Sequence, residues 1–250
     1  MTNITNPATD LFSSINQISD SIIGASDSGE LNAALWQLNE VLGCDGAVFM
    51  SFARDDESLE SYRYVVACPL AWCNEYNKNA WFTIDPCLLY AMTNTEPALI
   101  QDIPLRSLGQ KNMMAAASMA GFKSGLVVPT HSSIGRSRMG VLYVGSRDPN
   151  FFNETALAKT RILLRSLSGE LLDWWIRKAK TDLLGESTLT VEEIYLLRLS
   201  HAGHKSKEIA QHLSASKAAV DQKLFRISSK FGTSSRKIAA QMAHDFGLLK

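Results

Sequence analysis

One segment, "LAWCNEYNKNAWFTIDPCL" at residues 70–88, gathers side chains that can bind the polar end of a small molecule. Trp72 and Tyr76 are four residues apart, so on a helix they share one face, and Asp85 follows after a short loop. An indole N–H donates to a carbonyl, a carboxylate accepts from an amide N–H, and a phenol hydroxyl donates. These three residues predict a site for a ligand in which an amide-like donor neighbours a carbonyl.

Each of these residues also has a purely structural explanation. Asp85 followed by Pro86 is a good N-cap and first-turn pair for a helix over "PCLLYAM". Trp72 and Tyr76 alone are typical of a core, but the three residues at this spacing favour a ligand site. An enzyme that uses Asp85 with His131 or a cysteine is a weaker alternative, because no nucleophile-elbow motif lies beside His131.

The rest of the chain must supply the elements that position this segment. Apolar residues at helical spacing occur in "LFSSINQISDSIIG", "ELNAALWQLNEVLG" and "KNMMAAASMAGF", and a long helix is expected from about Glu154 to Lys180. The runs "GAVFMSFA", "SYRYVVAC", "SGLVVPTH" and "MGVLYVGS" are typical of strands, and "SSIGRS" is typical of a hairpin turn. Helices before, among and after antiparallel strands predict an α/β/α sandwich, which often encloses a pocket on one face of its sheet.

The pattern changes near "TDLLGES", and everything after it is helical. Thr190 and Glu193 form a capping box for a helix that stops at Gly203, and "SKEIAQHL" is a short second helix. Ser216 caps a third helix, which ends at Gly232, and "SSRKIAAQMAHDFGLL" is the fourth. This all-α, four-helix unit predicts a helix-turn-helix, whose second helix enters the DNA major groove. The alternative is a basic bundle for dimerisation or docking.

The formal net charge of zero hides an asymmetry between the two parts of the chain. Residues 189–250 hold ten Lys and Arg against five Asp and Glu, so they carry +5 and the remainder carries −5. A basic module joined to an acidic one favours a polyanion as partner of the C-terminal part, although a solvated basic surface explains the charge equally well.

Composition and cysteine spacing exclude several classes of protein. With 46% hydrophobic and 20% charged residues the profile is that of a soluble globular protein, and no apolar run is long enough to suggest a leader or a membrane span. A cytoplasmic location is expected. The cysteines show no metal-binding or disulfide pattern, so neither a metal nor a cofactor is predicted and reduced thiols are expected at Cys44, Cys68, Cys73 and Cys87.

The C-terminal sequence resembles the LuxR-type DNA-binding domain over its whole length. The resemblance rests on Leu189, Thr190, Glu193, Leu197, Gly203, Glu208, Ile209, Ala210, Leu213, Ser216, Val220, Lys230 and the closing "FGLL". The opening segment is similar to the ligand-binding domain of acyl-homoserine-lactone receptors in the same family. The similarity rests on Trp72, Tyr76, Asp85 and Pro86, and on Gly125 in "SGLVVP".

Several positions depart from the usual family residues. Cys68 stands where a Tyr is usual, Ile100 where a second Trp is usual, and Met114 where an aromatic residue is frequent. In the third helix of the C-terminal unit the departures are at Ala219, Asp221 and Lys223. The pocket is therefore expected to lack the aromatic cap over the head group of the ligand, and the DNA sequence preference of the family cannot be carried over.

The resemblance implies a divergent or orphan quorum-sensing transcription regulator, not an enzyme. Residues 1–175 are expected to form the autoinducer-binding domain, 176–188 a linker and 189–250 the DNA-binding domain. The expected partners are a small amphiphilic signal, such as an acyl-homoserine lactone analogue, and double-stranded promoter DNA with an inverted repeat, read by a homodimer. A constitutive regulator of the same family that needs no ligand is the alternative.

These expectations assign residues to each site. The expected ligand contacts are Trp72, Tyr76, Asp85, Ile100, Met114, Ala117 and Phe122. The expected DNA contacts are Lys217, Asp221, Gln222, Lys223, Arg226 and Lys230. The long helix before the linker offers four apolar residues for a dimer interface or the core, namely Leu171, Leu172, Trp174 and Trp175.

Overall fold

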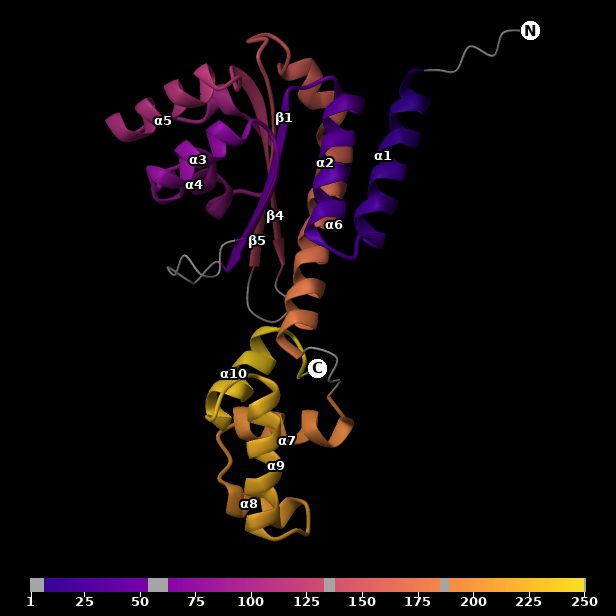
Figure 1. Ribbon diagram of the computed structural model, residues 1–250, viewed down its shortest axis with the longest axis vertical. Helices are drawn as coiled ribbons and strands as arrows, with labels where there is room; N and C mark the ends of the chain where they lie inside the picture. The colour runs from indigo at the N-terminus through magenta and orange to yellow at the C-terminus, as the bar shows by residue number, and fades with distance from the viewer. Residues whose placement is uncertain (1–6, 54–62, 133–137, 185–188, 250) are drawn as a thin grey trace, which may run out of the picture. The chain divides into compact units, whose positions relative to one another are not determined.

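The computed structural model describes residues 7–53, 63–132, 138–184 and 189–249, which divide into two compact units (Figure 1). The N-terminal unit extends to Trp174 and the C-terminal unit begins at Trp175. The division falls within α6 (Glu154–Leu184), which continues four residues beyond the expected end at Lys180. Residues 176–184 of the expected linker are thus helical, and 185–188 lie outside the described residues.

Five antiparallel strands form the sheet of the N-terminal unit, in the order β2-β1-β5-β4-β3. The strands are β1 (Gly46–Ala53), β2 (Arg63–Ala67), β3 (Ala98–Leu99), β4 (Ser124–Ser132) and β5 (Arg138–Ser146). The four strands expected from the sequence are confirmed. The two-residue strand β3 was not expected, and the hairpin turn proposed at 132–137 falls almost entirely outside the described residues.

Helices cover both faces of this sheet, which confirms the α/β/α sandwich (Figure 1). On one face lie α2 (Ser28–Leu42), α6 and, outside α2, α1 (Pro7–Gly24). On the other lie α3 (Leu70–Lys78), α4 (Pro86–Thr93) and α5 (Leu108–Met119), with the 3-10 turns η2 (Trp81–Thr83) and η3 (Ile100–Asp102) beside them. Because side chains alternate along a strand, Phe49 faces the first layer, whereas Val48 and Met50 face α3 to α5.

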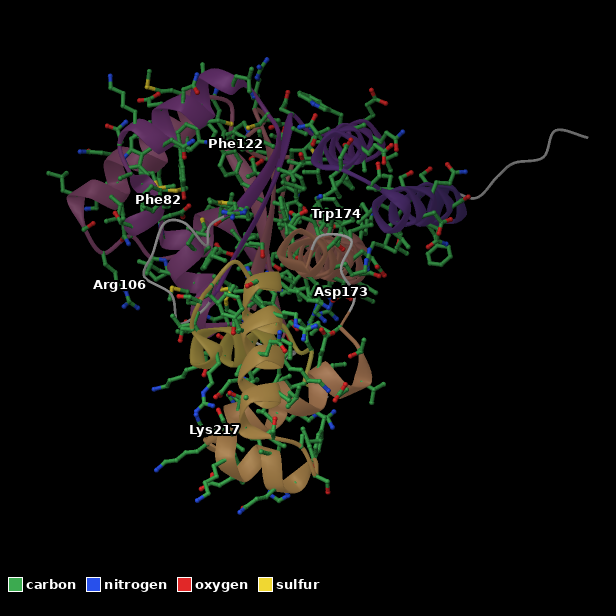
Figure 2. All side chains as sticks on the ribbon, turned by 60° about the horizontal axis from the view of Figure 1, so that its bottom comes forward. Phe82, Arg106, Phe122, Asp173, Trp174 and Lys217 are labelled. Atoms are coloured by element: carbon green, nitrogen blue, oxygen red, sulfur yellow. The ribbon has the colours of Figure 1, made fainter. Side chains whose placement is uncertain are left out.

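Side-chain hydrogen bonds attach the first helical layer to the sheet. The amide of Asn39 on α2 donates to the carbonyl oxygen of Ala67 at 2.8 Å, and the hydroxyl of Ser168 on α6 donates to that of Val128 at 3.2 Å. The indole of Trp174 donates to the carbonyl oxygen of Ala25 at 2.7 Å. Trp174 and Phe122 lie on opposite sides of the sheet (Figure 2).

The four apolar residues near the end of α6 therefore have different environments. Leu171, Leu172 and Trp174 are buried in the core of the N-terminal unit, so the core is their role within one chain. Trp175 is half-buried. Exposed apolar side chains on this layer are Phe12, Trp36 and Ile162.

The C-terminal unit consists of α7 (Val191–His201), α8 (Ser206–His212), α9 (Lys217–Lys230) and α10 (Arg236–Asp245), the four helices expected. Thr190 and Glu193 form the expected capping box, and Ser216 accepts from the Ala219 N–H as N-cap of α9. Buried side chains from all four helices form its core: Leu196, Leu197, Ile209, Ala210, Val220, Leu224, Ile227, Phe231, Ala239, Ala240 and Ala243. None of the described helices is long and apolar enough to cross a membrane.

Candidate ligand pocket and nucleic-acid interface

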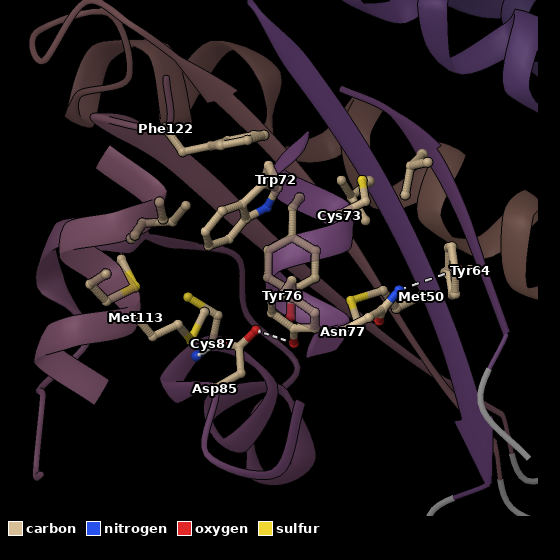
Figure 3. A pocket seen from close by; sticks show the side chains of 16 residues that line it. Met50, Tyr64, Trp72, Cys73, Tyr76, Asn77, Asp85, Cys87, Met113 and Phe122 are labelled. Carbon is tan, nitrogen blue, oxygen red and sulfur yellow. Dashed lines mark hydrogen bonds between the residues drawn. The ribbon is translucent and has the colours of Figure 1, made fainter. Parts of the chain in front are cut away.

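A pocket of about 80 Å³ lies between the sheet and helices α3 to α5 (Figure 3). It brings together all seven residues expected at the ligand site: Trp72, Tyr76, Asp85, Ile100, Met114, Ala117 and Phe122. Their contact with a ligand stays a prediction. Sequence reasoning missed nine further lining residues: Val48, Met50, Tyr64, Val66, Cys73, Asn77, Cys87, Met113 and Tyr143.

The aromatic wall of the pocket is built on α3. Trp72 and Tyr76 are one helical turn apart and both buried, with ring centroids 5.8 Å apart in an edge-to-face arrangement. Trp81 from η2 packs against both rings, with centroids 5.4 Å from Trp72 and 6.4 Å from Tyr76, and Phe122 approaches Trp72 at 6.1 Å. Trp81 was not expected at the site, because its position depends on the turn at Ala80, which has a left-handed backbone (φ 48°).

The carboxylate of Asp85 accepts from two backbone N–H groups and one hydroxyl, and the Cys87 thiol is a further partner. Oδ1 accepts from the N–H groups of Cys87 at 2.8 Å and Leu88 at 3.3 Å. Asp85 is therefore the N-cap of α4, as the Asp85–Pro86 pair predicted. Oδ2 accepts from the hydroxyl of Tyr76 at 2.8 Å (Figure 3). A carboxylate has about four acceptor positions, so these partners leave little unused capacity, and a ligand donor must share or replace one of them.

The environment of Asp85 changes its acidity. Burial raises the pKa of the Asp85 carboxyl above its usual value, and the hydrogen bonds from Tyr76, Cys87 and Leu88 oppose that rise only in part. Burial and, to a smaller extent, the charge of this carboxylate raise the pKa of the Cys87 thiol. Asp85 is thus a buried acceptor in surroundings that disfavour its charge.

A few other polar groups line the pocket. Among the described residues, no acceptor lies within hydrogen-bonding distance of the indole N–H of Trp72, which lines the pocket. At the edge strand β2, the amide of Asn77 donates to the hydroxyl of Tyr64 at 3.5 Å (Figure 3). The other walls are mostly apolar, and they include the flexible side chains of Met50 and Met113. The pocket therefore has one polar end and an adaptable apolar body.

Three glycines in neighbouring strands make room for two pocket side chains. Gly46 pairs with Gly145, which pairs with Gly125, so the three form a row across β1, β5 and β4. A Cβ added at Gly145 would collide with the ring of Phe122, and one at Gly125 would lie 2.5 Å from Cδ1 of Ile100. Of this glycine row, sequence reasoning identified only Gly125, because pairing between distant strands is not visible in local patterns.

The groups considered for an enzyme are not assembled around this pocket. His131 lies on β4, where its Nε2 is 3.1 Å from the carbonyl oxygen of Asn94, and it is not a pocket-lining residue. Within the part of the chain that the structure describes, no three His, Cys, Asp or Glu side chains are grouped to hold a metal ion.

The candidate nucleic-acid interface is the exposed face of α9. Lys217, Asp221, Gln222 and Arg226 are exposed, and the Lys217 ammonium lies 3.1 Å from the Asp221 carboxylate. Figure 2 shows Lys217 at the surface of the helical unit. Phe225, which sequence reasoning missed, is 62% exposed on the same helix. An aromatic ring on a polar, exposed helix face can contact a thymine methyl group.

The other two lysines expected at this interface form ion pairs within the C-terminal unit. Lys223 forms an ion pair with Glu192 of α7. Lys230 lies 2.8 Å from Glu193, the capping-box residue, and both side chains are mostly buried. Burial disfavours the charge of Glu193, but Lys230 and Thr190 hold the pKa of its carboxyl below the usual value. Lys230 therefore ties α9 to the start of α7.

Two comparisons of the sequence identify both units. Residues 27–172 match the autoinducer binding domain, and residues 187–243 match the family of bacterial regulatory proteins of the luxR type. The chain is also 22% identical to the transcriptional activator protein VanR of Vibrio anguillarum over 213 residues, which cover 83% of this chain and 85% of that protein.

Solved structures share the fold. SdiA in complex with octanoyl-rac-glycerol is 18% identical, with a TM-score of 0.76 over 96% of this chain and 97% of that one. Escherichia coli SdiA in another crystal form is 17% identical, with a TM-score of 0.76 over 96% and 99%. CepR2 of Burkholderia cenocepacia, an N-acylhomoserine lactone dependent LuxR family transcription factor, is 15% identical, with a TM-score of 0.58 over 69% and 99%. The chain belongs to the LuxR family of transcription regulators, which are not enzymes, and joins an autoinducer-binding domain to a LuxR-type helix-turn-helix domain.

Proposed function

We propose that this regulator binds promoter DNA inside the cell under the control of a small amphiphilic signal held in the pocket. The observation that carries the proposal is that Trp72, an N–H donor, and Asp85, a carboxylate acceptor, both line one mostly apolar pocket. A donor and an acceptor in the same pocket can bind a carbonyl and an N–H or O–H of one ligand.

The relatives support an acylated ligand. SdiA has been solved with octanoyl-rac-glycerol, and CepR2 is described as N-acylhomoserine lactone dependent. Both molecules join an acyl carbonyl to a head group that carries an O–H or N–H donor. We infer the same arrangement for the ligand of this chain, with its carbonyl on Trp72 and its donor on Asp85.

The residues around the head-group end favour a head group other than a homoserine lactone. Ile100 and Met114 line the pocket and offer no hydrogen bond to a lactone, whose desolvation is then poorly offset. Long-chain acyl-homoserine lactones should bind poorly or not at all. The pocket volume of about 80 Å³ is also below the roughly 300–1,000 Å³ of typical ligand sites, so a ligand of ordinary size must displace lining side chains, of which the methionines are the most flexible.

Binding would act through stability and assembly. A ligand bound only by the folded domain adds RT ln(1 + [L]/Kd) to its free energy of unfolding, which favours the folded, dimerisation-competent sensor. A homodimer would place two copies of α9 in successive major grooves of an inverted repeat. Sedimentation that shows only monomer at micromolar concentration, with and without DNA, would contradict this assembly.

A paired substitution tests the ligand site. Organic extracts of the purified protein are searched by mass spectrometry for a stoichiometric molecule, which is then used in thermal-shift titrations. Trp72→Phe keeps an aromatic ring but removes the N–H, so it should abolish most of the thermal shift. Trp36→Phe, at a 46% exposed position on α2, is the matched control and should keep the shift. Equal shifts in both variants would remove Trp72 from the ligand site.

The alternative is a constitutive regulator that needs no ligand. It is favoured by one observation, namely that Asp85 already has Tyr76 and the start of α4 as partners. In that case the extracts contain no stoichiometric molecule, and the purified protein binds its promoter equally well before and after extraction.

A further inference from the structure

Two thiols meet on the wall of the ligand pocket. Cys68 follows directly after β2, and Cys73 lies in the first turns of α3, with Pro69 between the two elements. Their sulfur atoms are 3.3 Å apart. Cys68 is buried, whereas Cys73 is partly exposed and lines the pocket. A thiol that solvent can reach is therefore in direct contact with a second thiol that solvent cannot reach.

We propose that Cys68 and Cys73 form an oxidation site in which a hydroperoxide converts the two thiols into a disulfide. The proposal does not depend on the identity of the ligand, since it rests on the contact of the two sulfur atoms. It assigns a chemical role to Cys68, a residue that departs from the Tyr usual at its position.

The contact gives the two thiols different reactivities. A hydrogen bond from Cys68 holds the pKa of Cys73 below the ordinary thiol value, which burial alone would raise. The same hydrogen bond, and burial, raise the pKa of Cys68. Cys73, which ionises more readily and is accessible from the pocket, is thus assigned as the nucleophile, and Cys68 is the resolving thiol. By contrast, burial raises the pKa of Cys44 to about 11 and also raises that of Cys87, so both should react slowly.

The reaction has two balanced steps. The Cys73 thiolate attacks the terminal oxygen of the hydroperoxide, the O–O bond breaks, and the alkoxide leaves as an alcohol after taking a proton, so that Cys73 becomes a sulfenic acid. Cys68 then loses its proton, and its sulfur attacks the sulfur of Cys73 and expels hydroxide, which leaves as water. The two sulfur atoms together lose two electrons, and the peroxide oxygens gain them.

The disulfide would change the pocket. An S–S bond is about 2.05 Å long, so the sulfur atoms must approach by a little more than about 1 Å from their separation of 3.3 Å. This movement pulls the first turn of α3 towards the end of β2. Trp72, the neighbour of Cys73, moves with that turn, and its indole faces the pocket. Oxidation should therefore alter ligand binding.

Peptide mass spectrometry tests the proposal directly. Trypsin cleaves after Arg63 and Lys78, so both cysteines fall in one peptide, whereas Cys44 and Cys87 fall in two others. The full-length protein is treated with hydrogen peroxide, and remaining thiols are alkylated before digestion. The expected result is that the peptide of residues 64–78 loses two hydrogen atoms and takes up no alkylating reagent, while the other two peptides are still alkylated. A thiol reductant should reverse the change.

Single substitutions separate the two roles. Cys68→Ser should leave Cys73 as a sulfenic acid that a dimedone probe captures, and Cys73→Ser should abolish oxidation of this peptide. The proposal is overturned if the wild-type peptide stays fully reduced after the peroxide treatment, whether or not Cys44 or Cys87 is oxidised. It is also overturned if Cys68, in place of Cys73, captures the probe. The wild-type experiment decides the question even where a variant fails to fold.

Discussion

The hydroxyl of Tyr76 donates a 2.8 Å hydrogen bond to Oδ2 of Asp85 inside the N-terminal unit, while Oδ1 of the same carboxylate caps α4. One buried side chain therefore holds α3, the start of α4 and the polar end of the pocket together. The question whether Asp85 is a helix cap or a ligand contact has no exclusive answer, because its two oxygen atoms serve different partners. A ligand that binds to Asp85 would contact a group on which the fold also depends.

Tyr76→Phe should therefore destabilise the protein without a ligand. It removes one of the partners of Asp85 and leaves a buried oxygen less well satisfied, at a cost of about 1–3 kcal/mol in the free energy of unfolding. Urea unfolding measures the loss. Tyr90→Phe is the matched control, since the Tyr90 hydroxyl donates to the carbonyl oxygen of Glu96 near the surface and should cost less. An equal loss in both variants would mean that the Tyr76–Asp85 hydrogen bond contributes no more to the free energy of unfolding than the exposed hydrogen bond of Tyr90.

Asp85→Asn should change how stability depends on pH. Burial raises the folded-state pKa of Asp85 above the unfolded value of about 3.9, so the folded protein binds this proton more tightly. The stabilisation that this tighter proton binding adds to the free energy of unfolding is fully present below the unfolded pKa and is lost as pH rises through the folded pKa. The free energy of unfolding of the wild type, minus that of Asp85→Asn, should fall over this window and then level off. Urea unfolding of both proteins at several pH values tests this, and a difference that rises with pH would contradict it.

Patterns within short stretches predicted much of this structure. The four-residue spacing of Trp72 and Tyr76, the Asp85–Pro86 pair and the Thr190–Glu193 capping box each depend on a few neighbouring residues, and each forms as expected. The sandwich followed because alternating strands and amphipathic helices need one another to bury their apolar faces.

Long-range pairing could not be predicted in the same way. The strand register that aligns Gly46 with Gly145, the place of Trp81 against Trp72, and the ion pair of Lys230 with Glu193 all join residues far from one another or separated by irregular turns. Local spacing contains no information about such partners.

Gly145→Ala should disturb the pocket through Phe122. The added methyl group would collide with the ring of Phe122, and because β5 is in the middle of the sheet the ring must move, at about 1–3 kcal/mol. Thermal unfolding measures the loss, and ligand titration reports the change in the pocket. Gly169→Ala is the control, since nothing lies within 4 Å of an added Cβ there and alanine favours its helix. An unchanged melting temperature for Gly145→Ala would show that the ring of Phe122 can move aside without a cost in stability.

Lys230→Met should weaken the C-terminal unit more than it weakens contact with DNA. It removes the partner of Glu193, a mostly buried carboxylate, with an expected loss of about 1 kcal/mol at neutral pH. Since the pKa of Glu193 is lowered in the folded protein, this contribution is present above the unfolded pKa and is lost as pH falls through the folded pKa. Lys223→Met is the control, because the ion pair of Lys223 with Glu192 is more exposed. Its free energy of unfolding in urea should fall by less. The reverse order would contradict a structural role for Lys230.

Removal of the Asp221 charge should strengthen binding to DNA, because this carboxylate is exposed on α9 one helical turn from Lys217. A hydrogen bond from Ser206 and the ion pair with Lys217 hold the pKa of the Asp221 carboxyl below its usual value, so the group is charged at neutral pH. Asp221→Asn removes the repulsion of phosphate and frees the ammonium of Lys217. Affinity for a random-sequence duplex, measured by fluorescence anisotropy over a range of salt concentrations, should therefore rise.

In the wild type, Lys217→Met should lower the slope of log K against log salt by about 0.9 if Lys217 contacts one phosphate. Lys111→Met on α5 is the charge-matched control and should leave the slope unchanged.

If Asp221→Asn leaves affinity for random DNA unchanged but relaxes the preference at one base pair, Asp221 accepts a hydrogen bond from a cytosine amino group in the major groove. No change in affinity or preference would place this face of α9 away from DNA.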